Sequence, residues 1–177
     1  MIWQISLTGT GGQGIILAGI ILAEAAILEG KQAVQTQSYG PEARGGASKS
    51  EVIISDQEID YPKIVVADIL LAMSQEACNK YAGLLKRGGK LIVDATIVED
   101  IPALDADVLP AAITKAAREE LKNVMAANIV ALGVLVGSTG IVSREALKEA
   151  VLARVPKGTE ALNRQALEIG FRMGEKG

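Results

Sequence analysis

The residues best suited to chemistry form a glycine-rich segment near the start of the chain, Gly9-Thr10-Gly11-Gly12-Gln13-Gly14. It follows an alternating apolar and polar run, residues 2–8, that predicts a strand, and it precedes an apolar run, residues 13–29, that predicts a helix. Gly9, Gly11 and Gly14 match the spacing G-x-G-x-x-G between strand and helix, where main chain approaches a phosphate closely. The exposed N–H groups and the dipole at the helix start would favour an anion there.

The second half of a dinucleotide fingerprint is missing. An NAD site needs an acidic residue at the end of the second strand, about 20 residues further on, to bind the ribose. The predicted second strand, residues 32–37, ends in Val34-Gln35-Thr36-Gln37, and the next acid is Glu42 in the following loop. Three uses of the turn stay open: a nicotinamide site, a site for another phosphate-bearing ligand, or a tight turn for packing or a protein interface.

A second loop, residues 38–46, has a more distinctive sequence, Ser-Tyr-Gly-Pro-Glu-Ala-Arg-Gly-Gly. Its proline and glycines favour one defined shape, and Tyr39, Glu42 and Arg44 offer hydrogen-bonding groups. We expect the loop at the carboxyl edge of the sheet, beside the glycine turn. An ion pair between Glu42 and Arg44 would make it a structural loop. Alternatively, Arg44 and the glycine N–H groups contact an anion or a partner subunit.

Composition excludes several classes of function. The chain has 177 residues, 49% of them hydrophobic and only 3% aromatic, with a net charge of −3, which argues against a nucleic-acid-binding protein. There is no histidine, and Cys78 is the single cysteine. This chain alone therefore has no internal disulfide, cysteine-ligated zinc or iron–sulfur cluster, and we assign it no catalytic residue and no metal ligand. Cys78 is expected to be a buried thiol.

No segment has the features of a signal peptide or a membrane span. Residues 1–8 lack a basic start followed by an apolar core, and the apolar run 15–28 is shorter than the ~20 residues that a span requires. These observations predict a cytoplasmic protein that does not enter a membrane.

The remaining pattern predicts an α/β fold: a doubly wound, mostly parallel, Rossmann-like sheet with a helical C-terminal third, in a single domain spanning residues 1–177. Further strands are expected at residues 48–55, 69–73, 90–97 and 107–109, and further helices at 74–86, 114–122, 124–136, 143–154 and 159–173. Gly30 is expected to stop the first helix and Gly88-Gly89 the second. Asp94, near the middle of a strand, is expected to brace a loop. Asn128, inside a helix, is either an amide bonded to a neighbouring loop or a site residue.

Taken together, these motifs resemble the gamma subunit of 2-oxoacid:ferredoxin oxidoreductases. The resemblance rests on the glycine turn, the second loop with the strand after it, Asp60-Tyr61-Pro62, Val93-Asp94 and Asn128, and it spans nearly the whole chain. The run 38–46 is most similar to the 2-oxoglutarate enzymes, and the pyruvate and branched-chain oxoacid enzymes are also similar.

The resemblance implies a role within an assembly. Such enzymes decarboxylate a 2-oxoacid on thiamine diphosphate, pass electrons through iron–sulfur clusters to ferredoxin and release an acyl-coenzyme A. The thiamine site belongs to the alpha and beta subunits and the clusters to the beta subunit or a ferredoxin-like delta subunit. This chain would hold no cofactor alone and would help to receive coenzyme A. In isolation it would be inactive, and an apolar surface normally covered by partners would favour a homodimer.

By the same resemblance, the glycine turn and the second loop would form one wall of a site completed by other subunits, with Arg44 as the cation for coenzyme A phosphates. The residues of that wall are Gly9, Gly11, Gly12, Gln13, Gly14, Ser38, Tyr39, Arg44, Gly45 and Gly46. The alternatives are a free-standing nucleotide- or dinucleotide-binding protein and a structural adaptor without ligand contact.

Overall fold

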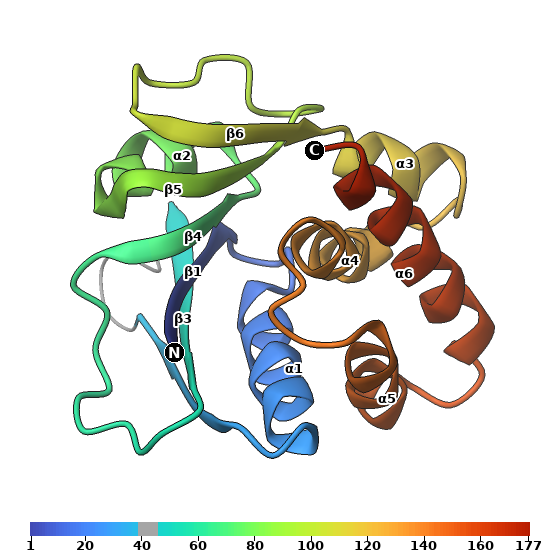
Figure 1. Ribbon diagram of the computed structural model, residues 1–177. Coiled ribbons are helices and arrows are strands. Elements are labelled where there is room, and N and C mark those ends of the chain that lie inside the picture. Colours follow the sequence, from blue (N-terminus) through green and yellow to red (C-terminus); the bar gives the residue numbers. More distant parts are fainter. Residues whose placement is uncertain (39–45) are drawn as a thin grey trace.

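The computed structural model describes residues 1–38 and 46–177. These residues form a six-stranded sheet in the order β2-β3-β1-β4-β5-β6 (Figure 1). The strands are β1 (Ile2–Thr10), β2 (Gln32–Gln37), β3 (Ala47–Ser55), β4 (Ala67–Ala72), β5 (Leu85–Asp94) and β6 (Ala106–Ala111). The helices are α1 (Ile15–Leu28), α2 (Gln75–Tyr81), α3 (Ile113–Glu119), α4 (Ala127–Thr139), α5 (Arg144–Arg154) and α6 (Glu160–Glu175), with short 3₁₀ turns η2 (Ala82–Leu84) and η3 (Val124–Ala126).

The sheet is mostly parallel. β1, β4, β5 and β6 run in one direction, and β3 runs antiparallel to both of its neighbours, β1 and β2. β3 therefore lies between β1 and β2, unlike the arrangement in which the second strand of a dinucleotide fold neighbours the first. The residue types of β3 and β2 fit an inner position for β3 and an edge position for β2. Val52, Ile53 and Ile54 of β3 are buried, whereas the glutamine-rich β2 is only partly covered at the sheet edge.

Helices cover both faces of this sheet, as a doubly wound fold requires. Ile5 and Leu7 of β1 belong to the larger core, together with residues of α1, α4, α5 and α6 (Figure 1). On the opposite face, Leu70 and Leu91 pack with Cys78 and other residues of α2. The predicted fold class, including the helical C-terminal third, is confirmed.

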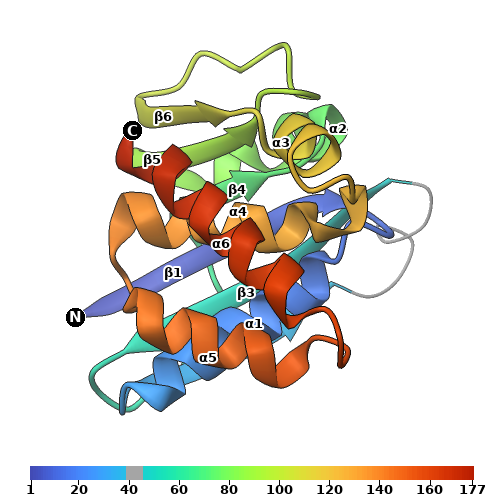
Figure 2. The ribbon, with the colours of Figure 1, turned by 90° about the vertical axis from the view of Figure 1, so that its right-hand side faces the viewer.

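The larger core depends on an unusually close crossing of α4 and α6, which Figure 2 shows from the side of α6. Gly133 and Gly137 on α4 meet Gly170 and Gly174 on α6, each pair spaced four residues apart. A Cβ atom at Gly170 would lie 2.3 Å from the Val130 carbonyl oxygen, and one at Gly174 would lie 2.5 Å from the Val134 carbonyl oxygen. Only glycine lets the two main chains approach so closely. Sequence analysis did not anticipate this crossing.

Two predicted features of the β4–β5 connection are wrong. The helix expected over residues 74–86 ends at Tyr81, and Gly88-Gly89, expected to stop that helix, lie inside β5. Gly88 has a φ of +74°, and a Cβ atom at Gly89 would lie 2.9 Å from the Lys86 carbonyl oxygen. These glycines thus permit a tight bend within a strand. Asp94 is the last residue of β5, not a residue near the middle of a strand.

The predicted stop of the first helix at Gly30 is confirmed, whereas three later helices have other bounds than expected: α3 ends at Glu119, α4 spans Ala127–Thr139 and α6 extends to Glu175. Gly30, with a φ of +80°, follows α1, and the Lys31 N–H donates to the Ala26 carbonyl in the hydrogen-bond pattern of a glycine helix stop. α1 itself begins at Ile15 and not at residue 13. None of the helices in the described part of the chain is both long enough and apolar enough to pass through a bilayer.

Candidate functional site

The glycine turn lies at the end of β1, at the point where the helices that follow neighbouring strands pass to opposite faces of the sheet. β1 and β4 are parallel neighbours, but α1, which follows β1, covers one face, and α2, which follows β4, covers the other. In an open α/β sheet, a crevice forms outside the carboxyl ends of two such strands, and ligands bind there. The chain therefore places residues 9–14 at the position of the fold most suited to a ligand.

Gln13 spans this crevice. Its Oε1 accepts a hydrogen bond from the Thr10 N–H at 2.7 Å, and its Nε2 donates to the Met73 carbonyl oxygen, just beyond β4, at 3.0 Å. A Cβ atom at Gly9 would lie 2.4 Å from Gln13 Oε1, so glycine at position 9 leaves room for this amide. Both ends of the Gln13 amide therefore bond within the chain, and its contact with a ligand or a partner stays a prediction.

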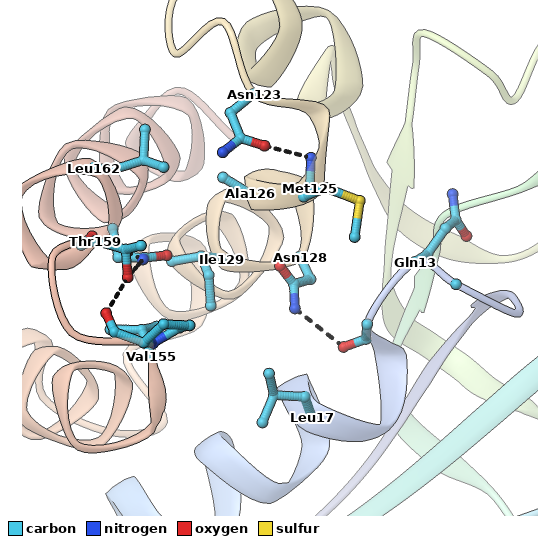
Figure 3. A pocket seen from close by; sticks show the side chains of 14 residues that line it. Gln13, Leu17, Asn123, Met125, Ala126, Asn128, Ile129, Val155, Thr159 and Leu162 are labelled. Atoms are coloured by element: carbon cyan, nitrogen blue, oxygen red, sulfur yellow. Dashed lines mark hydrogen bonds between the residues drawn. The ribbon is translucent and has the colours of Figure 1, made fainter.

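Asn128 holds the other end of the turn. Its Nδ2 donates to the Gly14 carbonyl oxygen at 3.2 Å, as the dashed line in Figure 3 shows. Gly14 has a φ of +74°, and a Cβ atom there would lie 2.4 Å from Asn128 Nδ2. Of the two hypotheses for Asn128, the structure supports an amide bonded to a neighbouring loop, although this side chain also lines the groove described below.

Between these two anchors, the main chain of Gly11 and Gly12 is open. Among the described residues, none lies within 4 Å of a Cβ atom built at either position, and Gly12 has a φ of +88°. Within the same residues, none accepts a hydrogen bond from the N–H of Gly11, Gly12 or Gly14. The first turn of α1 carries no acidic residue and no side-chain cap. This edge is therefore free to donate hydrogen bonds to an anion.

A shallow groove adjoins this edge, between the start of α1, the segment before α4 and the start of α6 (Figure 3). It has a volume of about 300 Å³. Leu17, Ile129 and Leu162 give it an apolar wall, and Asn123, Asn128 and Asn163 give it amides. Met125, which is 76% exposed, lines this groove and also a smaller one of about 140 Å³ that reaches Ile97 and Thr114.

The described ends of the second loop lie beside the glycine turn, as expected. The Ser38 N–H donates to the Lys49 carbonyl oxygen at 3.0 Å. Ala47, which follows Gly46, pairs with Thr10 at the end of β1. The sequence predictions for Tyr39, Arg44 and Gly45 concern positions outside the described residues.

Asp94 supports the same edge of the sheet. Its fully buried carboxylate accepts hydrogen bonds from the Thr96 N–H at 3.1 Å and from both the N–H and the hydroxyl of Thr114. These bonds attach the end of β5 to the start of α3, so Asp94 braces a loop as expected. Cys78 lies on the buried side of α2, and this burial raises the pKa of its thiol. Neither residue faces the groove.

Comparison with known proteins identifies the family. The model of the pyruvate ferredoxin/flavodoxin oxidoreductase family matches residues 4–173. The chain belongs to this family.

Relatives within the family include chains of matching length. Subunit KorC of 2-oxoglutarate synthase from Methanocaldococcus jannaschii is 51% identical, over 98% of this chain and 94% of the relative. The crystal structure of a keto/oxoacid ferredoxin oxidoreductase gamma subunit from Geobacter sulfurreducens is 50% identical, covers 99% of both chains and superposes with a TM-score of 0.91. Ketoisovalerate oxidoreductase subunit VorA from Methanothermobacter thermautotrophicus is 33% identical over 98% of this chain but only 35% of its own length.

Sequence analysis missed the far wall of the groove. Met125 and Leu162 belong to segments that the sequence pattern presents as ordinary helix, and no local motif marks them. The signals that could have found this wall were the paired glycines of α4 and α6, because their spacing predicts a close approach of the two helices. That approach sets the start of α6 against the segment before α4.

Proposed function

We propose that this chain is the gamma subunit of a 2-oxoacid:ferredoxin oxidoreductase, which converts 2-oxoglutarate or a related 2-oxoacid to its acyl-coenzyme A and transfers electrons to ferredoxin. The observation that carries the proposal is the 51% identity to a 2-oxoglutarate synthase subunit over nearly the full length of both chains. The match to a gamma subunit structure over 99% of both chains supports it.

On this proposal, the chemistry of decarboxylation and electron transfer belongs to alpha, beta and ferredoxin-like delta partners. They would carry the thiamine diphosphate and the iron–sulfur clusters. The residues of this chain fit that division: it has no histidine and one cysteine, which is buried. Within the described residues, no three potential ligands among Cys, Asp and Glu are grouped so as to hold a metal ion.

The contribution of this chain would be one wall of the coenzyme A site. Three features support this role: the open N–H groups of Gly11, Gly12 and Gly14, the adjoining groove and the position of Ser38 and Gly46 beside the turn. An open N–H edge at a helix start suits a phosphate, and a mostly apolar groove suits the uncharged part of an elongated ligand. Arg44 is the cation that we propose for the phosphates, on the sequence argument alone.

Reconstitution tests the assembly role. The tagged chain, recovered from its native cell extract, should bring with it chains that contain thiamine diphosphate and iron. The recovered complex should reduce ferredoxin with 2-oxoglutarate and coenzyme A, whereas the purified chain alone should not. Turnover by the purified chain alone would overturn the proposal.

A purely structural adaptor is separated from a coenzyme A wall by Arg44→Ala. We expect this change to raise the Michaelis constant for coenzyme A in the assembled complex, because a charge-assisted contact to phosphate is lost. Arg87→Ala is the control, because Arg87 is an exposed residue near the opposite, amino end of β5. Weaker assembly with an unchanged Michaelis constant would favour the adaptor.

A free-standing dinucleotide-binding protein remains the competing hypothesis because of the glycine turn. The absence of an acidic residue from Gln32–Gln37 argues against it. Calorimetry of the purified chain with NAD, NADP and FAD should show no binding.

A further inference from the structure

The glycine turn has little main-chain support of its own. Its one internal main-chain hydrogen bond among the described residues joins the Gln13 N–H to the Thr10 carbonyl oxygen at 3.3 Å, which is longer than the usual 2.9–3.0 Å. Gly12 and Gly14 add conformational freedom at two of its positions, both with positive φ. A short segment of this kind keeps one shape only if side chains hold it.

The Gln13 amide provides that support from the β4 side. It receives the Thr10 N–H at 2.7 Å and donates to the Met73 carbonyl oxygen at 3.0 Å, so it joins the end of β1 to the residue just before α2. Ser74, the next residue, caps α2 by accepting from the Ala77 N–H at 3.1 Å. Gln13 thus connects the two strand-to-helix junctions on either side of the crevice. The Asn128 bond to the Gly14 carbonyl oxygen fixes the other end.

We propose that Gln13 is a positioning residue for the reaction: it does not bind the ligand but holds the N–H groups of Gly11 and Gly12 in the orientation that receives coenzyme A. This inference rests on the proposed function. It predicts that loss of the Gln13 bonds weakens coenzyme A binding while the 2-oxoacid step, which takes place on partner subunits, is unaffected.

Two variants of Gln13 separate its hydrogen bonds. Gln13→Glu keeps an acceptor for the Thr10 N–H but places a carboxylate oxygen against the Met73 carbonyl oxygen. Gln13→Met removes both bonds with little change in volume and none in charge. The matched control is Gln35→Glu, because Gln35 is a partly buried amide on β2 that donates to Ser50 Oγ at 3.0 Å and lies outside the glycine turn.

The experiment uses the assembled oxidoreductase with each variant. We expect both Gln13 variants to raise the Michaelis constant for coenzyme A about tenfold. The turnover number at saturating coenzyme A and the Michaelis constant for 2-oxoglutarate should stay within about twofold of the wild type, and Gln35→Glu should change none of the three. In the isolated chain, amide hydrogen exchange at positions 10 and 13, the two hydrogen-bonded N–H groups of the turn, should accelerate in Gln13→Met and not in Gln35→Glu.

The outcomes distinguish the inference from the proposed function. An active wild-type complex whose Gln13 variants keep the wild-type Michaelis constant for coenzyme A would overturn the inference alone. So would an equal rise in the Michaelis constants for coenzyme A and for 2-oxoglutarate. Unchanged amide exchange at positions 10 and 13, in a Gln13→Met chain that folds but does not assemble, would also overturn it. A wild-type complex without coenzyme A-dependent turnover would overturn the proposed function, and this inference with it.

Discussion

Glu29 shows how one side chain attaches the helical third of the chain to the end of α1. Its carboxylate accepts hydrogen bonds from the N–H and hydroxyl of Ser143, the residue that caps α5, and pairs with Lys31 Nζ at 3.2 Å. Burial alone would raise the pKa of Glu29, but the Ser143 bonds and the Lys31 charge outweigh it, and the pKa lies below the ordinary value of 4.5.

The direction of this pKa shift gives a prediction for pH. The Glu29 carboxyl group is a stronger acid in the folded chain than in the unfolded chain. Its contribution to stability is therefore present above pH 4.5 and is lost as the pH falls through the pKa of the folded state. Glu29→Gln should therefore lower the free energy of unfolding by about 1 kcal/mol near neutral pH. The difference from wild type should shrink toward zero as the pH falls below 4.5, as measured by urea unfolding at several pH values.

The control for that measurement is Glu168→Gln. Glu168 pairs with Lys148 at 3.7 Å on an exposed surface, and exposed pairs contribute little to stability. A difference for Glu29→Gln that persisted unchanged at acidic pH would contradict the assignment to its ionised carboxylate.

At the scale of elements, the crossing of α4 and α6 places the far wall of the groove. The paired glycines bring the two main chains together, and Thr159 and Leu162 at the start of α6 then lie across the groove from Gln13 and Leu17. The sheet alone would supply only the glycine turn. The groove needs the C-terminal helices as well.

Gly170→Ala tests this crossing. The added methyl group would lie 2.3 Å from the Val130 carbonyl oxygen and 2.7 Å from the Gly133 Cα atom, so α6 must shift. We expect a loss of about 2–3 kcal/mol in the free energy of unfolding, measured with urea. Gly83→Ala is the control, since a Cβ atom at Gly83 would meet no described residue within 4 Å, and this variant should be close to neutral. Equal stability of the two variants would show that α4 and α6 can separate at little cost.

At the scale of the whole molecule, one core joins the two ends of the chain. Ile5 and Leu7 near the N-terminus share a continuous cluster of buried side chains with Leu167 and Phe171 of α6. α1 packs against β2 and β3 on one side and against α5 on the other. The sheet therefore cannot lose those helices without exposing its own core.

This shared core supports a proposal that residues 1–177 unfold in one cooperative step. The single tryptophan, Trp3, packs against the core from β1, whereas most of the helix lies in the C-terminal half. Tryptophan fluorescence and far-ultraviolet circular dichroism should therefore report the same urea midpoint. Two separate midpoints would mean that the helical third is an independent unit.

Local sequence determined the features that depend on residues close in the chain. The strand and helix of the glycine turn, the stop at Gly30 and the caps at Ser74 and Ser143 follow from side-chain type and short spacing, and the structure has each of them. The sequences of the two loops, residues 9–14 and 38–46, also predicted the family through their resemblance to its members. These features are local because a cap or a turn satisfies its hydrogen bonds within a few residues.

Tertiary structure decided what depends on distant contacts. It placed β3 between β1 and β2. It also placed Gly88-Gly89 inside a strand, where Gly89 pairs with Ala106 of β6 and a Cβ atom would lie 3.0 Å from the Asp68 carbonyl oxygen. It also showed that Gln13 bridges the crevice, through a bond to the Met73 carbonyl oxygen 60 residues away in the chain. Spacing in the sequence cannot reveal such a partner, since it depends on how the strands pack side by side.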